Sequence, residues 1–227
     1  DHVNMILRYV PYVQTNFVLG LDTDEGPEPF ELTKHFLDLA PAAFPAFSLL
    51  SAFGSAAPLN LELQRAGRVL PFPFHFLDAS QSMNVVPKNY AWPVFYDHLL
   101  DLERYAYSWP HIARRFRANE GQIAKWMNVV RGASSERNGR VKQHARVRSL
   151  LDSDSSVRSF FDGDTTTVPR PYMDRIQADL GPLWSALPPG GLEHDPNEYL
   201  HHVSEPGTGG IVVPARTKPA RAAVASA

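Results

Sequence analysis

Two strand-and-helix units in succession constrain the fold of this chain more than any other feature of its sequence. The stretch VQTNFVLGL (13–21) is rich in β-branched and aromatic residues and ends at an acidic turn, which predicts a strand. A second apolar run, FPAFSLLSAFG (44–54), ends at glycine and predicts another. Helical patterns follow the two runs, at 27–39 and 58–70. This order favours parallel pairing, because parallel strands must be joined by a crossover.

Two parallel strands cannot form a stable sheet of their own. Parallel sheets are normally covered on both faces, and two-stranded sheets are rarely stable in isolation. We therefore expect residues 1–75 to belong to a larger α/β unit. From about residue 92 the hydrophobic spacing becomes helical, so residues 76–200 are expected to form a mostly helical extension. Proline, glycine and small residues dominate 201–227, which predicts a disordered tail.

Several ordered motifs carry a resemblance to a known family. They are NFVLGLD (16–22) followed by EPFE (28–31), FSLLSAFGSAAPL (47–59), ELQRAGRVL (62–70) and NVVPKNYAWPVFYDHLLDL (84–102). Together they make residues 10–110 similar to the C-terminal part of the radical S-adenosylmethionine (radical SAM) barrel. The closest likeness is to the subgroup that often carries an N-terminal cobalamin-binding domain. The resemblance implies an α/β fold in which this chain supplies the last βα units of a partial (β/α)6 TIM-like barrel, followed by the helical extension.

The resemblance also implies cofactors that this chain cannot hold by itself. Enzymes of the family bind a [4Fe–4S] cluster through a Cys-x3-Cys-x2-Cys loop and bind S-adenosylmethionine (SAM) at that cluster, and cobalamin is a further possible cofactor. The chain contains no cysteine, which excludes disulfides, a thiol nucleophile and thiolate ligation of a cluster. We therefore expect a C-terminal fragment, inactive alone, whose partner is the N-terminal barrel half of the same polypeptide. Its substrate, a small molecule or a modified polymer, is not identified by the sequence.

Barrel active sites gather at the carboxyl ends of the strands, which gives a set of candidate residues. By the resemblance, the cofactor-binding candidates at the two strand ends are Gly20, Leu21, Asp22, Ser51, Ala52 and Phe53. Glycine allows close approach to a ligand, and a carboxylate can accept a hydrogen bond from a ribose hydroxyl. An alternative stays open in which the acidic residues only shape a turn and favour the start of the next helix.

Side-chain alternation along the first strand gives a second set of candidates. Gln14 and Asn16 share one face of that strand with Val18, and polar side chains facing a barrel interior are expected to contact the substrate. The register leaves open whether this face points to the barrel or to solvent. No catalytic residue and no metal ligand is assigned within the chain.

An uneven charge distribution supplies the alternative function. Residues 112–148 hold ten Lys/Arg against two Asp/Glu, a net charge of +8, although the whole chain has a net charge of −2. Such a segment suits a non-catalytic helical protein that binds RNA or another polyanion, but no nucleic-acid-binding motif supports it, so nucleic acid is not the expected partner. Within it, helical spacing predicts that Ile123, Trp126, Met127 and Val130 face inward. With no apolar run long enough to span a membrane, we expect a cytoplasmic protein.

Overall fold

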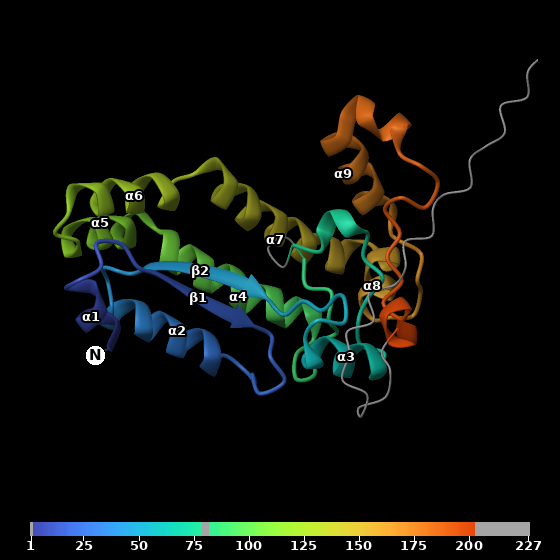
Figure 1. Cartoon of the computed structure of the whole chain (residues 1–227), viewed down its shortest axis with the longest axis horizontal. Coiled ribbons are helices and arrows are strands. Elements are labelled where there is room, and N and C mark those ends of the chain that lie inside the picture. Colours follow the sequence, from blue (N-terminus) through green and yellow to red (C-terminus); the bar gives the residue numbers. More distant parts are fainter. Residues whose placement is uncertain (1, 79–81, 203–227) are drawn as a thin grey trace, which may run out of the picture.

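The computed structural model describes residues 2–78 and 82–202, which form an α/β structure that is mostly helical (Figure 1). Its strands are β1 (Gln14–Leu19) and β2 (Phe44–Leu49). Its α-helices are α1 (His2–Leu7), α2 (Glu28–Leu39), α3 (Pro58–Arg65), α4 (Trp92–Tyr107), α5 (Trp109–Ala118), α6 (Gln122–Gly132), α7 (Ser135–Ser153), α8 (Ser155–Phe161) and α9 (Arg170–Leu180). Three short 3-10 helices complete it: η1 (Phe74–Phe76), η2 (Gly181–Ala186) and η3 (Glu198–His202). Nearly all of the predicted 201–227 tail lies outside the described residues.

The two strands pair in parallel, as the strand–helix order predicts. Gln14 lies opposite Phe44 and Leu19 opposite Leu49, with α2 as the crossover. Both strands point toward the end of the molecule that holds α3 and α8, while α1, α5 and α6 lie near their amino ends (Figure 1). Proline in the first turn of α2, and Glu28 and Glu31 beside it, favour the helix start.

Helices cover one face of this sheet. Phe17 of β1 packs edge-on against Phe36 of α2, with ring centroids 5.3 Å apart. Phe47 of β2 packs on Tyr107 of α4 at 5.7 Å, and the Tyr107 hydroxyl donates a hydrogen bond to the Pro45 carbonyl. The sheet, α2 and α4 therefore share one core, which fixes the strand ends relative to the helical part of the chain.

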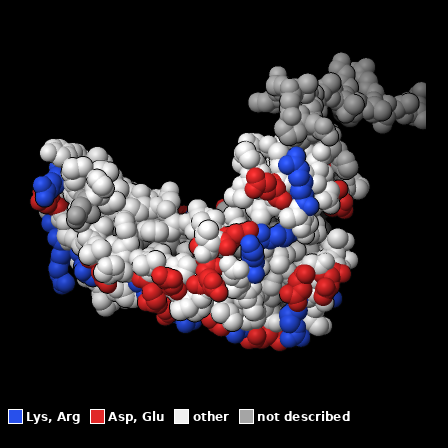
Figure 2. Space-filling model, turned by 90° about the horizontal axis from the view of Figure 1, so that it is seen from below, with Lys and Arg blue, Asp and Glu red and all other residues white. Residues whose placement is uncertain are grey.

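The opposite face of the sheet is open along β1, whereas Phe44 on the same face of β2 is buried against Tyr12 and Arg131. Gln14, Asn16 and Val18 are exposed along β1, and the Val18 side chain is 48% exposed. Within the described residues the sheet has only two strands, so each strand leaves one edge unpaired and no barrel is closed. Figure 2 shows the molecule hollowed between its two ends, and the hollow carries few charged side chains in that view.

An aromatic core lies beyond the carboxyl ends of the strands. Phe72, in the connector after α3, touches Phe160 and Phe161 of α8 and Tyr172 of α9, with ring centroids 4.9 to 5.5 Å apart. The Trp92 indole of α4 donates a hydrogen bond to the Phe161 carbonyl at 2.8 Å. This cluster attaches α8 and α9 to the strand-bearing half of the chain.

The orientation predicted for α6 is wrong. Its small residues Ala124, Asn128 and Gly132 are the buried ones, and they pack on α5. A Cβ built on Gly132 would lie only 3.1 Å from the Ile112 side chain, so the two helices approach closely because this position is glycine. The large apolar residues point away from the core instead: Ile123, Trp126, Met127 and Val130 are all exposed.

Candidate functional site

The first predicted strand end is occupied by the protein's own side chains. Gly20 is buried and has a φ of +87°, and a Cβ added there would lie 2.8 Å from the Met83 side chain. The backbone amides of Gly20 and Leu21 both donate to the Asp24 carboxylate, at 2.9 and 3.0 Å. Asp24 therefore closes the turn, which is the structural role left open for the acidic residues after β1.

Asp22 is held by an arginine at the other side of this turn. Two Arg68 nitrogens donate to the two Asp22 carboxylate oxygens at 2.7 Å each, and Arg68 also donates to the Val86 carbonyl. The hydrogen bond from Arg68 is the main cause that holds the pKa of Asp22 below its ordinary value. Both carboxylate oxygens are thus engaged in a contact that links the β1 turn to the chain after α3.

Replacing Arg68 by methionine should lower the free energy of unfolding by about 1–2 kcal/mol near neutral pH, because a backbone carbonyl and a carboxylate lose their partner. The pKa of Asp22 is depressed in the folded state. The stabilisation that the Asp22 carboxylate contributes to the folded state is therefore fully present above the pKa of Asp22 in the unfolded chain. It is lost as the pH falls through the pKa of Asp22 in the folded chain. The difference in the free energy of unfolding between wild type and Arg68→Met should become smaller below about pH 4, which urea unfolding at several pH values would measure. Arg65→Met, at an exposed position on α3, is the control, and a difference constant down to low pH would contradict this role of Asp22.

The second predicted strand end is partly buried and partly exposed. Ala52 is fully buried, and both of its backbone groups bind the Asn84 side chain: its amide donates to Oδ1 at 3.0 Å, and its carbonyl accepts from Nδ2 at 2.8 Å. Ser51 is half-buried. The Phe53 side chain is 49% exposed, and its backbone carbonyl accepts a hydrogen bond from Asn60. Of the six strand-end candidates, Leu21, Asp22, Ser51 and Phe53 keep accessible side-chain surface, although both Asp22 oxygens already bind Arg68.

Gln14 and Asn16 lie together on the open face of the sheet. The Gln14 amide donates to the Asn16 side-chain oxygen at 2.6 Å. Their neighbours across the sheet on the same face are Phe44 and Ala46, as the strand register shows. The structure thus brings the two residues side by side near the amino end of β1, whereas the strand-end candidates lie at its carboxyl end.

The residues of this chain fit only in part the cofactors that the resemblance to radical SAM enzymes implies. A [4Fe–4S] cluster has no thiolate ligand here, since cysteine is absent. Among residues 2–78 and 82–202, no group of three His, Asp or Glu side chains is placed to hold a metal ion. The exposed Phe53 ring and Leu21 side chain suit an apolar contact with a nucleoside base, whereas the Asp22 carboxylate is already engaged by Arg68.

Several cations of the basic segment 112–148 are paired with carboxylates of the same chain, and one is buried. Arg114 binds Asp38 of α2, and Arg148 of α7 binds Asp97 of α4 at 2.7 Å. Arg115 is buried next to the Phe44 ring, and burial lowers its pKa to about 10. Exposed cations remain at Arg117, Lys142 and Arg146. Figure 2 shows acidic and basic side chains mingled along the face in view.

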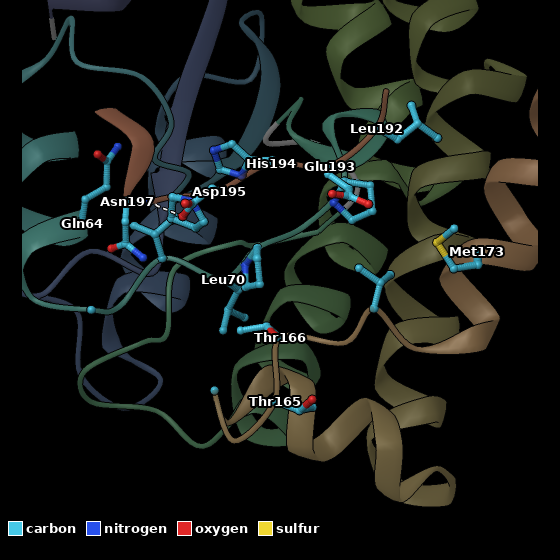
Figure 3. Close-up of a pocket in the computed structure, with 17 residues that line it drawn as sticks. Gln64, Leu70, Thr165, Thr166, Met173, Leu192, Glu193, His194, Asp195 and Asn197 are labelled. Atoms are coloured by element: carbon cyan, nitrogen blue, oxygen red, sulfur yellow. Dashed lines mark hydrogen bonds between the residues drawn. The ribbon is translucent and has the colours of Figure 1, made fainter. Parts of the chain in front are cut away.

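A cavity that sequence reasoning missed lies beyond the aromatic core (Figure 3). It has a volume of about 710 Å³ and is walled by α3, the connector 69–73, the loop between α8 and α9, and the segment 192–197. Gln64 of α3 lies on one side of it and Met173 of α9 on the other (Figure 3). Because α9 and the four other segments that form it are spread along the sequence from Gln64 to Asn197, no local pattern in the sequence marks it.

His194 is the most deeply buried polar residue of this cavity wall after Gln64. Its ring is 4% exposed, lies 5.3 Å from the Phe74 ring, and carries no hydrogen-bond partner on either nitrogen within the described structure. Burial is the main cause that lowers the pKa of His194, while Asp195 and the nearby Phe72 backbone oppose the shift. Because burial outweighs these opposing contributions and lowers the pKa of His194, the neutral form of the ring is favoured at pH 7.

Comparison with known proteins identifies no relative in which this site is described. Neither a protein-family model, nor a curated protein, nor a solved structure matches this chain. Within the described residues, no helix combines the length and the apolar character needed to cross a membrane.

Proposed function

We propose that this chain forms the last two strand–helix units of a radical SAM barrel and closes one side of its active site. The observation that supports the proposal is the row of exposed side chains along β1, on the sheet face that α2 does not cover. One face is packed on α2 and α4, and the other exposes Val18 between polar neighbours. Parallel sheets are normally covered on both faces, so a further polypeptide segment is expected to cover the exposed side chains of β1. The unpaired strand edges are expected to form backbone hydrogen bonds with further strands.

The side chains present in this chain determine which roles we assign to it and which to the N-terminal barrel half. The cluster is assigned to the N-terminal barrel half, because no residue of this chain can ligate it through sulfur. SAM, which supplies the radical chemistry in that family, would meet this chain at the exposed strand-end side chains of Leu21, Ser51 and Phe53. Gln14 and Asn16 would contribute hydrogen-bonding groups to the interior face. The chain's own role is to orient the bound molecules and to exclude water.

The decisive experiment starts from the native polypeptide. An antibody raised against this chain should isolate a longer polypeptide, and mass spectrometry should find a Cys-x3-Cys-x2-Cys loop upstream of residue 1. Purified without oxygen and reduced with dithionite, that polypeptide should cleave SAM to 5′-deoxyadenosine. A native polypeptide without such a loop would overturn the proposal. Retention of the present chain on heparin at moderate salt would instead favour the polyanion-binding alternative, carried by its exposed cations.

A variant of Val18 tests whether the exposed side chains of β1 are covered in the longer polypeptide. Val18→Arg should leave the stability of the present chain nearly unchanged, because the side chain is half-exposed. In the longer polypeptide the same change buries an unpaired charge and should reduce SAM cleavage by about tenfold or more. Leu32→Arg, at an exposed position on the outer side of α2, is the matched control and should preserve both properties. Equal activity of the two variants would show that the open face stays uncovered.

A further inference from the structure

The charged side chains that line the cavity beside His194 are both acidic, in a chain with a net charge of only −2. Glu193 and Asp195 both line it, and none of its lining residues is Lys or Arg. Glu198 follows closely in the same segment, which contains no cation to compensate it. The Asp195 carboxylate accepts one hydrogen bond, from the Asn197 amide at 2.8 Å, and retains further acceptor capacity (Figure 3).

Two buried polar side chains in the wall hold atoms without partners. The Gln64 side chain donates to the Gly54 carbonyl at 3.0 Å, but its Oε1 accepts nothing. No group meets hydrogen-bonding geometry at either nitrogen of the His194 ring, although the Phe72 backbone lies near it. An unsatisfied buried polar group destabilises the folded chain, so a ligand that supplies a donor to such an atom is favoured.

The remaining wall is apolar and wide enough for an organic molecule. Leu70, Val168, Met173 and Leu192 face the space together with three prolines. A volume of about 710 Å³ falls within the range of small-molecule sites, about 300–1,000 Å³. The site therefore combines an apolar body with carboxylates and hydrogen-bond acceptors, and it lacks a cation that would attract an anion.

We infer that this cavity binds an organic cation, namely a primary amine carried on an apolar body. The ammonium group would lie between Glu193 and Asp195, near Gln64 and His194, and the apolar part would lie against Leu70 and Met173. An ammonium group has three donors and no acceptor, which matches a wall that offers mainly acceptors. The inference concerns the present chain alone and does not depend on the barrel proposal.

A matched chemical series tests the charge of the ligand. Hexylamine, 1-hexanol and hexanoate share one apolar body and carry a positive, a zero and a negative charge. Titration calorimetry on the whole chain should show binding of hexylamine, weaker binding of hexanol and none of hexanoate. Added NaCl should weaken the binding of hexylamine, because salt screens exposed charges. Hexanoate binding as tightly as hexylamine would overturn the inference.

Three variants and one spectroscopic signal locate the site. Glu193→Gln and Asp195→Asn should each raise the Kd for hexylamine about threefold to fivefold, the effect expected of a partly exposed charge. Glu62→Gln, on α3 but outside the cavity lining, should leave it unchanged. In the wild-type chain, saturating hexylamine should shift the imidazole NMR resonances of His194. Unshifted resonances, or wild-type affinity in both carboxylate variants, would refute the site.

Discussion

Replacing Phe72 by alanine should lower the free energy of unfolding by about 3–5 kcal/mol, the loss typical of a fully buried phenylalanine. Phe72 is fully buried, and its ring lies within 5.5 Å of the rings of Phe160, Phe161 and Tyr172. Alanine would leave a cavity lined by these rings and would remove their edge-to-face contacts. Because α8 and α9 are attached to the strand-bearing half through this cluster, urea unfolding should detect the loss directly.

The matched control is an aromatic residue of the same type at the surface. Phe53→Ala should change the free energy of unfolding by less than about 1 kcal/mol, because the Phe53 side chain is half-exposed. If Phe72→Ala is too unstable to purify, Phe72→Leu keeps most of the volume and should cost about 1–2 kcal/mol. Equal losses in Phe72→Ala and Phe53→Ala would show that the cluster does not hold the two halves together.

The strands and their parallel pairing were predictable, because they depend on local composition and on chain order. The predicted strand segments 13–21 and 44–54 contain β1 and β2. The helix between them provides the crossover connection that parallel pairing requires. The helical spacing in 76–200 predicted a mostly helical extension but not the bounds of a helix as short as α8, whose seven residues are capped by Asp154, which accepts from the amides of Ser156 and Val157. The orientation of α6 was predicted wrongly because hydrophobicity favours the large residues for the core. The close contact with α5 instead selects the small ones.

In the candidate site, too, features that depend on local sequence were predictable, whereas features that depend on tertiary contacts were not. Sequence alternation placed Gln14 and Asn16 on one face of β1, and the structure has them there together. It gave no sign that Arg68 binds Asp22, because 46 residues separate the two in the chain. The cavity beside His194 depends on segments between α3 and η3 that only the folded chain brings together. A signal in the sequence was the acidic segment 193–198, which composition marks without showing what faces it.

Asn84 connects the strand-end loop to the chain that follows it, and it does so from a fully buried position. Its side chain acts as a hydrogen-bonding partner for both backbone groups of Ala52, as a neighbouring strand would. The Asn84 carbonyl also accepts a hydrogen bond from the Leu70 amide at 2.7 Å. Asn84 thereby holds the end of β2, where Ser51 and Phe53 lie, against the connector that leads to the aromatic core.

Asn84→Leu should lower the free energy of unfolding by about 2–4 kcal/mol, because the amide and the carbonyl of Ala52 would stay buried without partners. Leucine is close to asparagine in size, so the loss would arise from the missing hydrogen bonds rather than from a cavity. Asn60→Leu is the matched control: its side chain also binds a strand-end carbonyl, that of Phe53 at 2.7 Å, but in an exposed position where water can replace it. Urea unfolding should separate the two variants, and amide hydrogen exchange at Ala52 should accelerate only in Asn84→Leu. Unchanged exchange at Ala52 would show that the Asn84 side chain does not hold this strand end.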